Sequence, residues 1–98
     1  HTFLALRLDG LARINFDMGR LDDAERQLDR AVAIEEKALG PTHAWLAQGL
    51  YNRAFVYRDQ GRLDLAAREA ERATQMYERV RGPEAVDVAN GLVLQADI

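Results

Sequence analysis

Cysteine and serine are both absent from this 98-residue sequence, and their absence limits the chemistry that the chain can perform. Without cysteine the chain forms no disulfide and offers no thiolate to a metal. A covalent mechanism would have to rely on three threonines, the single lysine Lys37, carboxylates, two histidines and three tyrosines. The sequence therefore disfavours an enzyme, and we assign no catalytic residue.

Long apolar runs and an excess of positive charge are also missing. No run approaches the roughly 20 apolar residues that cross a bilayer, and the N-terminus lacks the layout of a signal peptide. We therefore expect no membrane partner and a cytoplasmic setting. The net charge of -3 and pI of about 5.3 argue against nucleic acid, whose binding depends on clustered cations.

What the sequence does contain is typical of one folded domain, since 48% of its residues are hydrophobic and 30% are charged. The chain begins at His1 rather than at methionine, which favours a fragment of a longer protein.

A repeat of 42 residues is the strongest signal. Shifting the sequence by that period aligns 21 identical residues over 56 pairs, and Gly19 to Asp22 falls on Gly61 to Asp64. A fixed period of this length indicates stacked supersecondary units. We place repeat 1 at residues 1–42, repeat 2 at 43–84 and a partial third repeat at 85–98.

Each repeat contains two segments whose apolar residues recur every three or four positions, the period of an amphipathic helix. We predict five helices, at residues 2–18, 22–39, 43–60, 64–81 and 84–98. The expected core stripes of the first helices are Leu4, Ala5, Leu8, Leu11 and Ala12, followed by Leu46, Ala47, Leu50, Ala54 and Tyr57. Those of the second helices are Ala24, Leu28, Ala31, Ile34 and Ala38, followed by Ala66, Ala70, Ala73, Met76 and Val80.

Glycine and aspartate mark the turn inside each repeat. Gly19 and Gly61 can adopt the left-handed conformation that closes a helix. Asp22 and Asp64 then lie where a side chain caps the next helix, and Asp22 with Glu25 resembles a capping box. Glycine-proline pairs at 40–41 and 82–83 should end the second helices, because proline cannot continue the hydrogen bonding.

The remaining polar clusters have structural explanations. His43 follows a glycine-proline turn and corresponds to His1, and a metal site would require these two histidines to converge, so we interpret His43 as a turn residue. The carboxylates of residues 22–25 fit a helix start, and Glu35 with Glu36 fits a solvated helix face. We expect no metal and no other cofactor.

The run AVAIEEKALGPTH at residues 31–43 resembles the helix junction of the kinesin-light-chain type of tetratricopeptide repeat, with consensus AL-x-I-x-E-K-x-L-G-x-x-H. Residues 56–61, VYRDQG, are similar to the end of that family's first helix. The resemblance implies an all-α, right-handed α-solenoid of antiparallel helix pairs, about two and a half repeats long. Its concave wall would be formed by the first helix of each pair and would hold an extended peptide or a partner helix.

Groove positions follow from the resemblance. In the prospective wall lie Leu6, Asp9, Arg13, Phe16 and Asp17 of repeat 1, Gln48, Tyr51, Asn52, Phe55, Arg58 and Asp59 of repeat 2, and Asn90, Val93 and Leu94 of repeat 3. The expected peptide-binding residues are Arg13, Asp17, Gln48, Tyr51, Asn52, Phe55, Arg58, Asp59 and Asn90.

Three of these positions have specific expected roles. Asn52 matches the family's groove asparagine, whose amide can both donate to and accept from a peptide backbone. Arg13 and Arg58 could hold an acidic group, or each could pair with a neighbouring carboxylate on a solvated face. Tyr51 and Phe55 form an aromatic patch that either receives a partner's hydrophobic side chain or packs against the next helix.

The sequence departs from its own repeat at several core positions. Asn15 corresponds to Tyr57, Ala70 corresponds to Leu28, and Arg53 and Gln95 correspond to Leu11. These exchanges leave the helical repeat intact but change its packing.

An interaction module is the function that we favour, within a larger signalling or regulatory protein. The cargo role of kinesin is not transferred, because this repeat type also occurs in many bacterial proteins, and twelve arginines against one lysine are consistent with a GC-rich bacterial source. The alternative is a structural spacer, or a segment that self-associates through exposed terminal helices, where Leu92, Val93, Leu94 and Ile98 would lack a cover. A binding module should keep a polar and aromatic concave wall, whereas a spacer should use those residues in internal ion pairs.

Overall fold

A computed structural model describes residues 2–40 and 43–98, and this part of the chain consists of five α-helices. They are α1 (Thr2–Asp17), α2 (Leu21–Leu39), α3 (Ala44–Asp59), α4 (Leu63–Arg81) and α5 (Val86–Asp97). The predicted all-α fold is confirmed. Every predicted helix boundary lies within two residues of the observed one.

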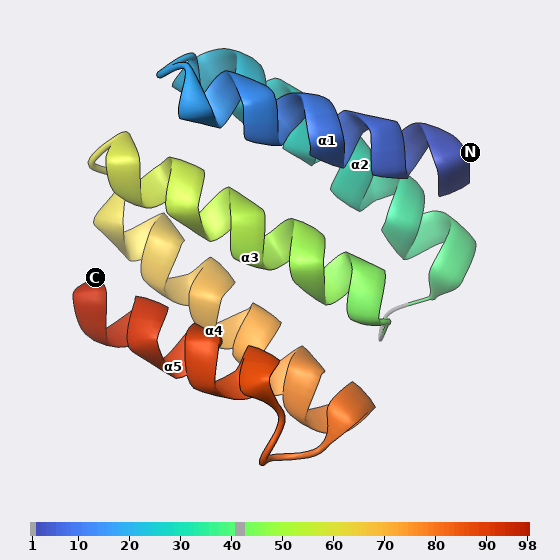
Figure 1. Cartoon of the computed structure of the whole chain (residues 1–98), viewed down its shortest axis with the longest axis vertical. Helices are drawn as coiled ribbons and strands as arrows, with labels where there is room; N and C mark the ends of the chain where they lie inside the picture. Colours follow the sequence, from blue (N-terminus) through green and yellow to red (C-terminus); the bar gives the residue numbers. More distant parts are fainter. Residues whose placement is uncertain (1, 41–42) are drawn as a thin grey trace.

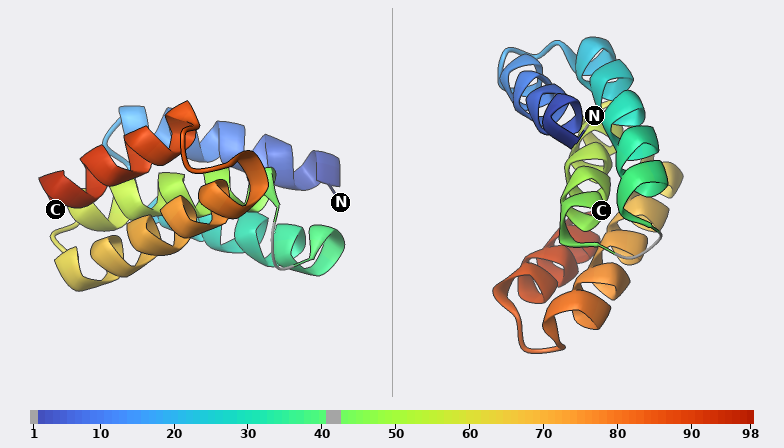
Figure 2. Two further views of the ribbon diagram at one scale, coloured as in Figure 1. Left: turned by 90° about the horizontal axis from the view of Figure 1, so that it is seen from below. Right: turned by 90° about the vertical axis from the view of Figure 1, so that its right-hand side faces the viewer.

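The helices stack in chain order, each antiparallel to the one before it (Figure 1). α1 packs against α2 and α3 against α4, while contacts of α2 with α3 and of α4 with α5 join the pairs. Figure 2 (right) shows two layers, with α1, α3 and α5 on one side and α2 and α4 on the other. The stack curves toward the side of α1, α3 and α5, which is therefore the concave wall.

Small alanines lie where the helices approach one another most closely. Ala5, Ala12, Ala31, Ala54 and Ala73 are almost completely buried. Short side chains at these points allow close contact between helix axes, while leucines fill the space beside them. The buried leucines are Leu8, Leu28, Leu46, Leu50 and Leu94.

Some of the predicted core stripes are wrong at their edges. Leu4 and Leu11 are exposed, because α1 has a neighbour on one side only among the described residues. Ala38 and Val80 are also exposed, near the ends of α2 and α4. Conversely, Tyr77, for which no burial was predicted, is buried in the core between α3 and α4.

The predicted left-handed glycines are confirmed at the turn inside each repeat. Gly19 has φ 78° and Gly61 has φ 80°, a region that favours glycine because a Cβ would clash there. The chain then closes both helices in the same way. Arg20 N–H donates to Asn15 O (2.8 Å) and Arg62 N–H donates to Tyr57 O (2.9 Å).

The predicted caps at Asp22 and Asp64 are wrong. α2 and α4 begin at Leu21 and Leu63, so both aspartates lie inside the first turn, and neither helix has a side-chain cap. Their charges still favour the positive end of the helix dipole. The capping box is also wrong, because Asp22 and Glu25 both accept hydrogen bonds from Gln60.

The second-helix ends and the following turn agree in part with prediction. Gly40 and Gly82 terminate α2 and α4, whereas Pro41 and Thr42, like His1, lie outside the described residues. His43 caps α3, and its Nδ1 accepts a hydrogen bond from Trp45 N–H at 3.1 Å. The predicted turn role of His43 is confirmed.

Candidate functional site

An open cavity of about 310 Å³ lies on the concave wall, where α1, α2 and α3 meet. Its floor is apolar and is formed by Ala12, Leu28 and Val56. The other lining residues are Arg13, Phe16, Asp17, Gln48, Tyr51, Asn52 and Phe55. A cavity of this size, with an apolar floor and polar groups at its rim, has the features of a ligand pocket.

Three aromatic rings form one wall of the cavity. The ring of Tyr51 lies edge-to-face on that of Phe55, with centroids 5.0 Å apart, and Phe16 meets Phe55 at 6.3 Å. Burial raises the pKa of the Tyr51 phenol, so this hydroxyl stays protonated at neutral pH. Tyr51 and Phe55 also pack against the core cluster of Ala54, Ala70 and Leu94, so the expected packing toward the next helices is present, while binding of a partner's side chain by this patch stays a prediction.

A chain of hydrogen bonds orients the amide of Asn52. The buried Tyr77 of α4 donates its hydroxyl proton to Gln48 Oε1 (2.9 Å). Gln48 Nε2 then donates to Asn52 Oδ1 (2.9 Å). Because the carbonyl oxygen of Asn52 is engaged, its Nδ2 group is the part that can donate to a ligand.

Two arginines flank the cavity on α1 and α3. Arg13 Nε lies 3.8 Å from Asp17 Oδ2, and both side chains are largely exposed, so this pair contributes little stability. The Arg58 guanidinium carbon lies 4.8 Å from the centroid of Phe55, while Arg58 Nε donates to Asp59 Oδ1 (3.2 Å). Stacking on Phe55 holds Arg58 beside the aromatic wall.

The expected binding residues do not all meet at this cavity. Six of them line it, namely Arg13, Asp17, Gln48, Tyr51, Asn52 and Phe55. Arg58 contacts the outer side of Phe55, Asp59 contacts Arg58, and Asn90 is exposed on α5. Asn90 is thus separated from the cavity by the second repeat junction.

At the second junction, a buried leucine, Leu94, takes the place that Asn52 has at the first. In the 42-residue register, Ala54 and Ala70 match the cavity floor residues Ala12 and Leu28, and Leu94 matches Asn52. Leu94 is 2% exposed and packs on Ala54 and Ala70. Its predicted place in the groove wall is therefore wrong, whereas its neighbour Val93 is exposed on α5.

Comparison with protein families matches residues 2–79 to the tetratricopeptide repeat. The chain belongs to the tetratricopeptide repeat family. A comparison with curated proteins gave no match. Membership of this family implies a role in protein–protein interaction, and the matched family is a repeat that is typically non-catalytic.

Two further properties concern membranes and metals. None of the helices in residues 2–40 and 43–98 is long and apolar enough to span a bilayer. Within the same residues no three potential metal-binding side chains of histidine or carboxylate type gather at one place. The absence of a cofactor stays a prediction.

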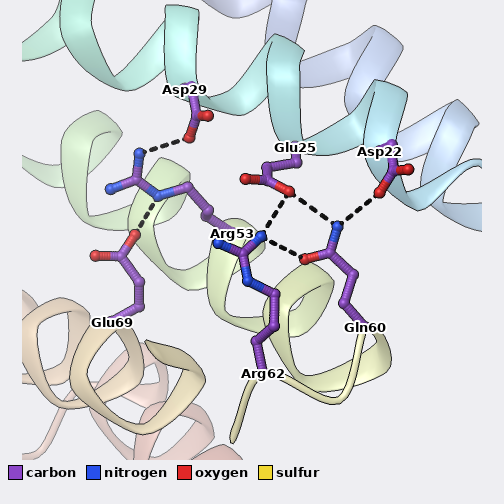
Figure 3. A network of polar contacts seen from close by, with 7 residues as sticks. All are labelled: Asp22, Glu25, Asp29, Arg53, Gln60, Arg62 and Glu69. Carbon is purple, nitrogen blue, oxygen red and sulfur yellow. Dashed lines mark hydrogen bonds and ion pairs between the residues drawn. The ribbon is translucent and has the colours of Figure 1, made fainter. Parts of the chain in front are cut away.

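Away from the groove, a polar seam joins the two tetratricopeptide repeats, and Figure 3 shows it from close by. Arg53 donates to Asp29 of α2 at 3.0 Å and to Glu69 of α4, so one side chain links three helices. Glu25 accepts from Gln60 and from Arg62 (2.8 Å). The hydrogen bond from Gln60 is the main cause that lowers the pKa of Glu25. Arg53 is thus a structural residue at a position that the repeat pattern predicts to be apolar.

A second polar feature overturns one of the sequence expectations. Glu35, predicted to lie on a solvated face, is 1% exposed, and Asp9, predicted to line the groove, faces it. Burial together with the negative charge of Asp9 raises the pKa of Glu35 to about 8. Burial raises the pKa of Asp9 to about 6. The residues around this pair include Gly49 of α3, whose missing side chain leaves room for Glu35 Oε1.

Sequence reasoning missed the residues that make the cavity hollow. Ala12, Leu28 and Val56 were assigned to the core or left unassigned, although they form the floor. The 42-residue repeat register is the signal that could have identified the cavity. A polar Asn52 stands where the next repeat has Leu94, and this exchange leaves one junction open and the other filled.

Proposed function

We propose that the chain binds an extended peptide in the concave groove and that one apolar side chain of the peptide occupies the cavity between α1, α2 and α3. The observation that carries this proposal is the cavity itself, which combines an apolar floor with the aromatic wall of Phe16, Tyr51 and Phe55. A volume of about 310 Å³ accommodates a side chain of the size of leucine, methionine or phenylalanine. Aromatic residues of this kind are common anchors in protein interfaces.

Asn52 supplies the polar recognition in this proposal. Its Oδ1 is already bonded to Gln48, so its Nδ2 donates to a carbonyl oxygen of the peptide backbone. The Tyr77–Gln48 hydrogen bond supports this arrangement because it fixes Gln48 from the buried side. A pre-oriented amide loses less conformational entropy when the ligand binds.

Charge then favours acidic residues beside the anchor. Arg13 lines the same cavity as the aromatic wall, Arg58 stacks on Phe55, and the carboxylates that neighbour the two arginines are at least partly exposed. Exposed pairs of this kind exchange partners at small cost. A carboxylate of the peptide can therefore compete with Asp17 or Asp59 for its arginine.

The broader setting is part of the same proposal. We infer that the repeats are of the kinesin-light-chain subtype and that they form a right-handed solenoid in two complete units, 1–42 and 43–84, with a partial third unit at 85–98. We also infer that the chain works in the cytoplasm as part of a bacterial signalling or regulatory protein. The long Gly-Pro-x-His junction at residues 40–43 and the arginine-rich composition support these inferences.

The test starts from linear peptides of random sequence, selected for binding to the immobilised chain. We expect the selected peptides to share one bulky apolar residue next to an acidic one. Removing the donor with Asn52→Ala should weaken binding by about five- to a hundredfold in calorimetric titration, because a hydrogen-bonding group lost from a buried contact costs about 1–3 kcal/mol. Arg58→Ala should weaken binding less at high salt than at low salt, because salt screens its charge.

A second variant fills the cavity instead of removing the hydrogen bond. Asn52→Leu copies the residue that closes the next junction, Leu94, and should abolish binding without lowering the melting temperature. Arg72→Ala is the matched control. Arg72 of α4 pairs with Glu36 of α2, away from the cavity, so affinity should stay within about twofold. Selected peptides that bind Asn52→Leu as tightly as the parent would show that the cavity is not the binding site.

A further inference from the structure

Two carboxyl groups lie together without a cation where α1, α2 and α3 meet. Glu35 is 1% exposed, and neither of its oxygens nor Asp9 Oδ1 receives a hydrogen bond from the described part of the chain. The ion pairs found there include neither residue. Arg13, one turn along α1 from Asp9, lies 3.8 Å from Asp17 instead. Asp9 and Glu35, which we call the carboxyl pair, therefore have acceptor atoms that the described residues do not use.

The internal repeat shows that the fold does not need carboxyl groups at these positions. In the 42-residue register, Asp9 corresponds to Tyr51 and Glu35 corresponds to Tyr77. Tyr77 is buried, and Tyr51 packs against the core cluster that contains it. Burial of aromatic rings stabilises a helix junction, whereas burial of a carboxyl group without a partner is unfavourable. Packing therefore does not account for the carboxyl pair, and groups that break a packing rule are typical of functional sites.

The carboxyl pair lies two helical turns from the cavity. Asp9 precedes the cavity residue Phe16 by seven positions on α1, and Glu35 follows the cavity residue Leu28 by seven positions on α2. Residues seven apart share one face of a helix. Because α1 and α2 are antiparallel (Figure 1), both offsets lead in the same direction along the molecule. At 1.5 Å per residue, about 10 Å separates the carboxyl pair from the cavity.

The third helix of the junction follows the same spacing. Gly49 of α3 precedes Val56, which forms part of the cavity floor, by seven positions. A Cβ at Gly49 would lie 3.0 Å from Glu35 Oε1, so the glycine leaves space beside this carboxyl group. Asp9 belongs to a helix of the concave wall and is only half-buried. The carboxyl pair is therefore accessible at Asp9.

We propose that the carboxyl pair is a subsite for a basic side chain, lysine or arginine, of the peptide that occupies the groove. This inference rests on the proposed function and adds a second recognition point to it. An extended peptide rises about 3.3 Å per residue, so side chains three positions apart are separated by about 10 Å. The basic residue therefore lies three positions from the apolar anchor. Lysine and arginine are donors without acceptor atoms, which complements two carboxylates.

Protons compete with the basic side chain for this subsite. Burial raises the pKa of Asp9 to about 6, and burial together with the charge of Asp9 raises the pKa of Glu35 to about 8. The carboxyl pair is thus largely protonated near pH 5 and has lost one proton by pH 7.5. Asp9 and Glu35 are the titrating groups that face each other from α1 and α2, while α3 contributes the uncharged Gly49. A cation should therefore bind more tightly at pH 7.5 than at pH 5.

The test uses capped pentapeptides of sequence ELAAK and KAALE, in which lysine lies three positions after or before the leucine anchor. Matched peptides carry glutamine in place of lysine. Each is titrated to about 10 mM into the ¹⁵N-labelled chain, because short peptides bind weakly. The Gly49 backbone amide reports on the carboxyl pair, and the Asn52 side-chain amide reports on the cavity.

We expect one lysine peptide to shift both reporters and to bind at least about fivefold more tightly than its glutamine counterpart at pH 7.5. At pH 5 this lysine advantage should fall below about twofold, because the carboxyl pair is then protonated.

A protein variant assigns the lysine advantage to the carboxyl pair. Asp9→Asn keeps the shape of the side chain and removes its charge, so the lysine advantage should disappear. Glu36→Gln is the matched control, because it makes the same kind of change one position from Glu35 on a side chain that pairs with Arg72 of α4. The control should keep the full advantage. Thermal unfolding of both variants checks that the helices remain folded.

Failure of this inference is distinguishable from failure of the proposed function. Equal affinities of the lysine and glutamine peptides, with shifts at Asn52, would overturn the subsite and leave the cavity anchor intact. Lysine-dependent shifts at Gly49 without any at Asn52 would support the subsite and refute the cavity anchor. An absence of shifts at both reporters would overturn both proposals.

Two further results would count against the subsite. One is a lysine advantage that survives Asp9→Asn, which would place the basic side chain elsewhere. The other is a Gly49 shift that calcium chloride produces at constant ionic strength and the lysine peptides do not. In that case the carboxyl pair would be a metal site rather than a peptide subsite.

Discussion

Replacing Glu35 by glutamine should change the pH dependence of stability more than any other single substitution in this chain. Glu35, which is buried, and Asp9, which is half-buried, form a pair of carboxyl groups between α1 and α2, next to Gly49 of α3. Two Glu35 oxygens and Asp9 Oδ1 have no hydrogen-bond donor from the protein within the described residues. A proton shared between the two carboxyl groups forms a hydrogen bond from one to the other, and its loss leaves two negative charges side by side.

The sign of the effect follows from the direction of the pKa shifts. Folding raises the pKa of Glu35 to about 8 and that of Asp9 to about 6, both above their unfolded values. Such groups contribute stability that is fully present below the unfolded pKa and is lost as the pH rises through the folded pKa. With respect to this pair, the protein is therefore more stable near pH 5 than near pH 8.5.

The magnitude is large for a domain of this size. One pKa unit corresponds to about 1.4 kcal/mol, and relaxation of the buried pair reduces the full value, so we expect a loss of about 2–4 kcal/mol between pH 5 and pH 8.5. At about 4–8 °C per kcal/mol for a small domain, the melting temperature should fall by roughly 8–32 °C. Glu25, whose pKa is lowered, acts in the opposite sense but only at more acidic pH.

The assay is thermal unfolding followed by circular dichroism at several pH values for the parent, Glu35→Gln and Asp9→Asn. Glu35→Gln should flatten the pH dependence and should melt at a higher temperature than the parent at pH 8.5. A parent protein that is more stable at pH 8.5 than at pH 5, with the same profile in Glu35→Gln, would refute the buried carboxyl pair.

Further substitutions test the packing. Arg53→Ala should cost about 3 kcal/mol in chemical denaturation because it leaves Glu69 buried without its cation, whereas the double variant Arg53→Leu, Glu69→Leu should be nearly neutral. Gly91→Ala should destabilise by about 1–3 kcal/mol, since the new Cβ overlaps Thr74 Oγ1, and Thr74→Ala should recover part of the loss. Gly10→Ala is its control and should stabilise α1 by up to about 1 kcal/mol, because nothing lies near the new methyl group. An equal response to the two glycine substitutions would contradict the packing of α5 on α4.

The helices were predictable from sequence because their signals are local. Gly19 and Gly61 must take a left-handed conformation wherever the helices end, and the alanine pattern has the period of a helix whatever its neighbours are. The caps were not predictable, because Asp22 is used by Gln60, a residue 38 positions away in the next repeat. Local capping rules do not include such a competitor.

The groove was predictable only as a set of positions. Whether a position is hollow depends on which side chain fills it, and Asn52 and Leu94 give opposite answers at equivalent places. Burial of Glu35 was not predictable either, because it depends on Gly49 of a different helix. Leu4 and Leu11 were assigned to the core because their pattern is that of a buried face, and this face lacks a neighbour among the described residues.

The most direct test of the groove is to map where a selected peptide binds by nuclear magnetic resonance of the ¹⁵N-labelled chain. We predict that the largest shifts on titration are those of the Asn52 and Gln48 side-chain amides and of backbone amides near Arg13 and Phe55, all at the cavity. Shifts concentrated instead on the α2 and α4 surface around Arg72 and Glu36, with the Asn52 side-chain amide unchanged, would contradict the account.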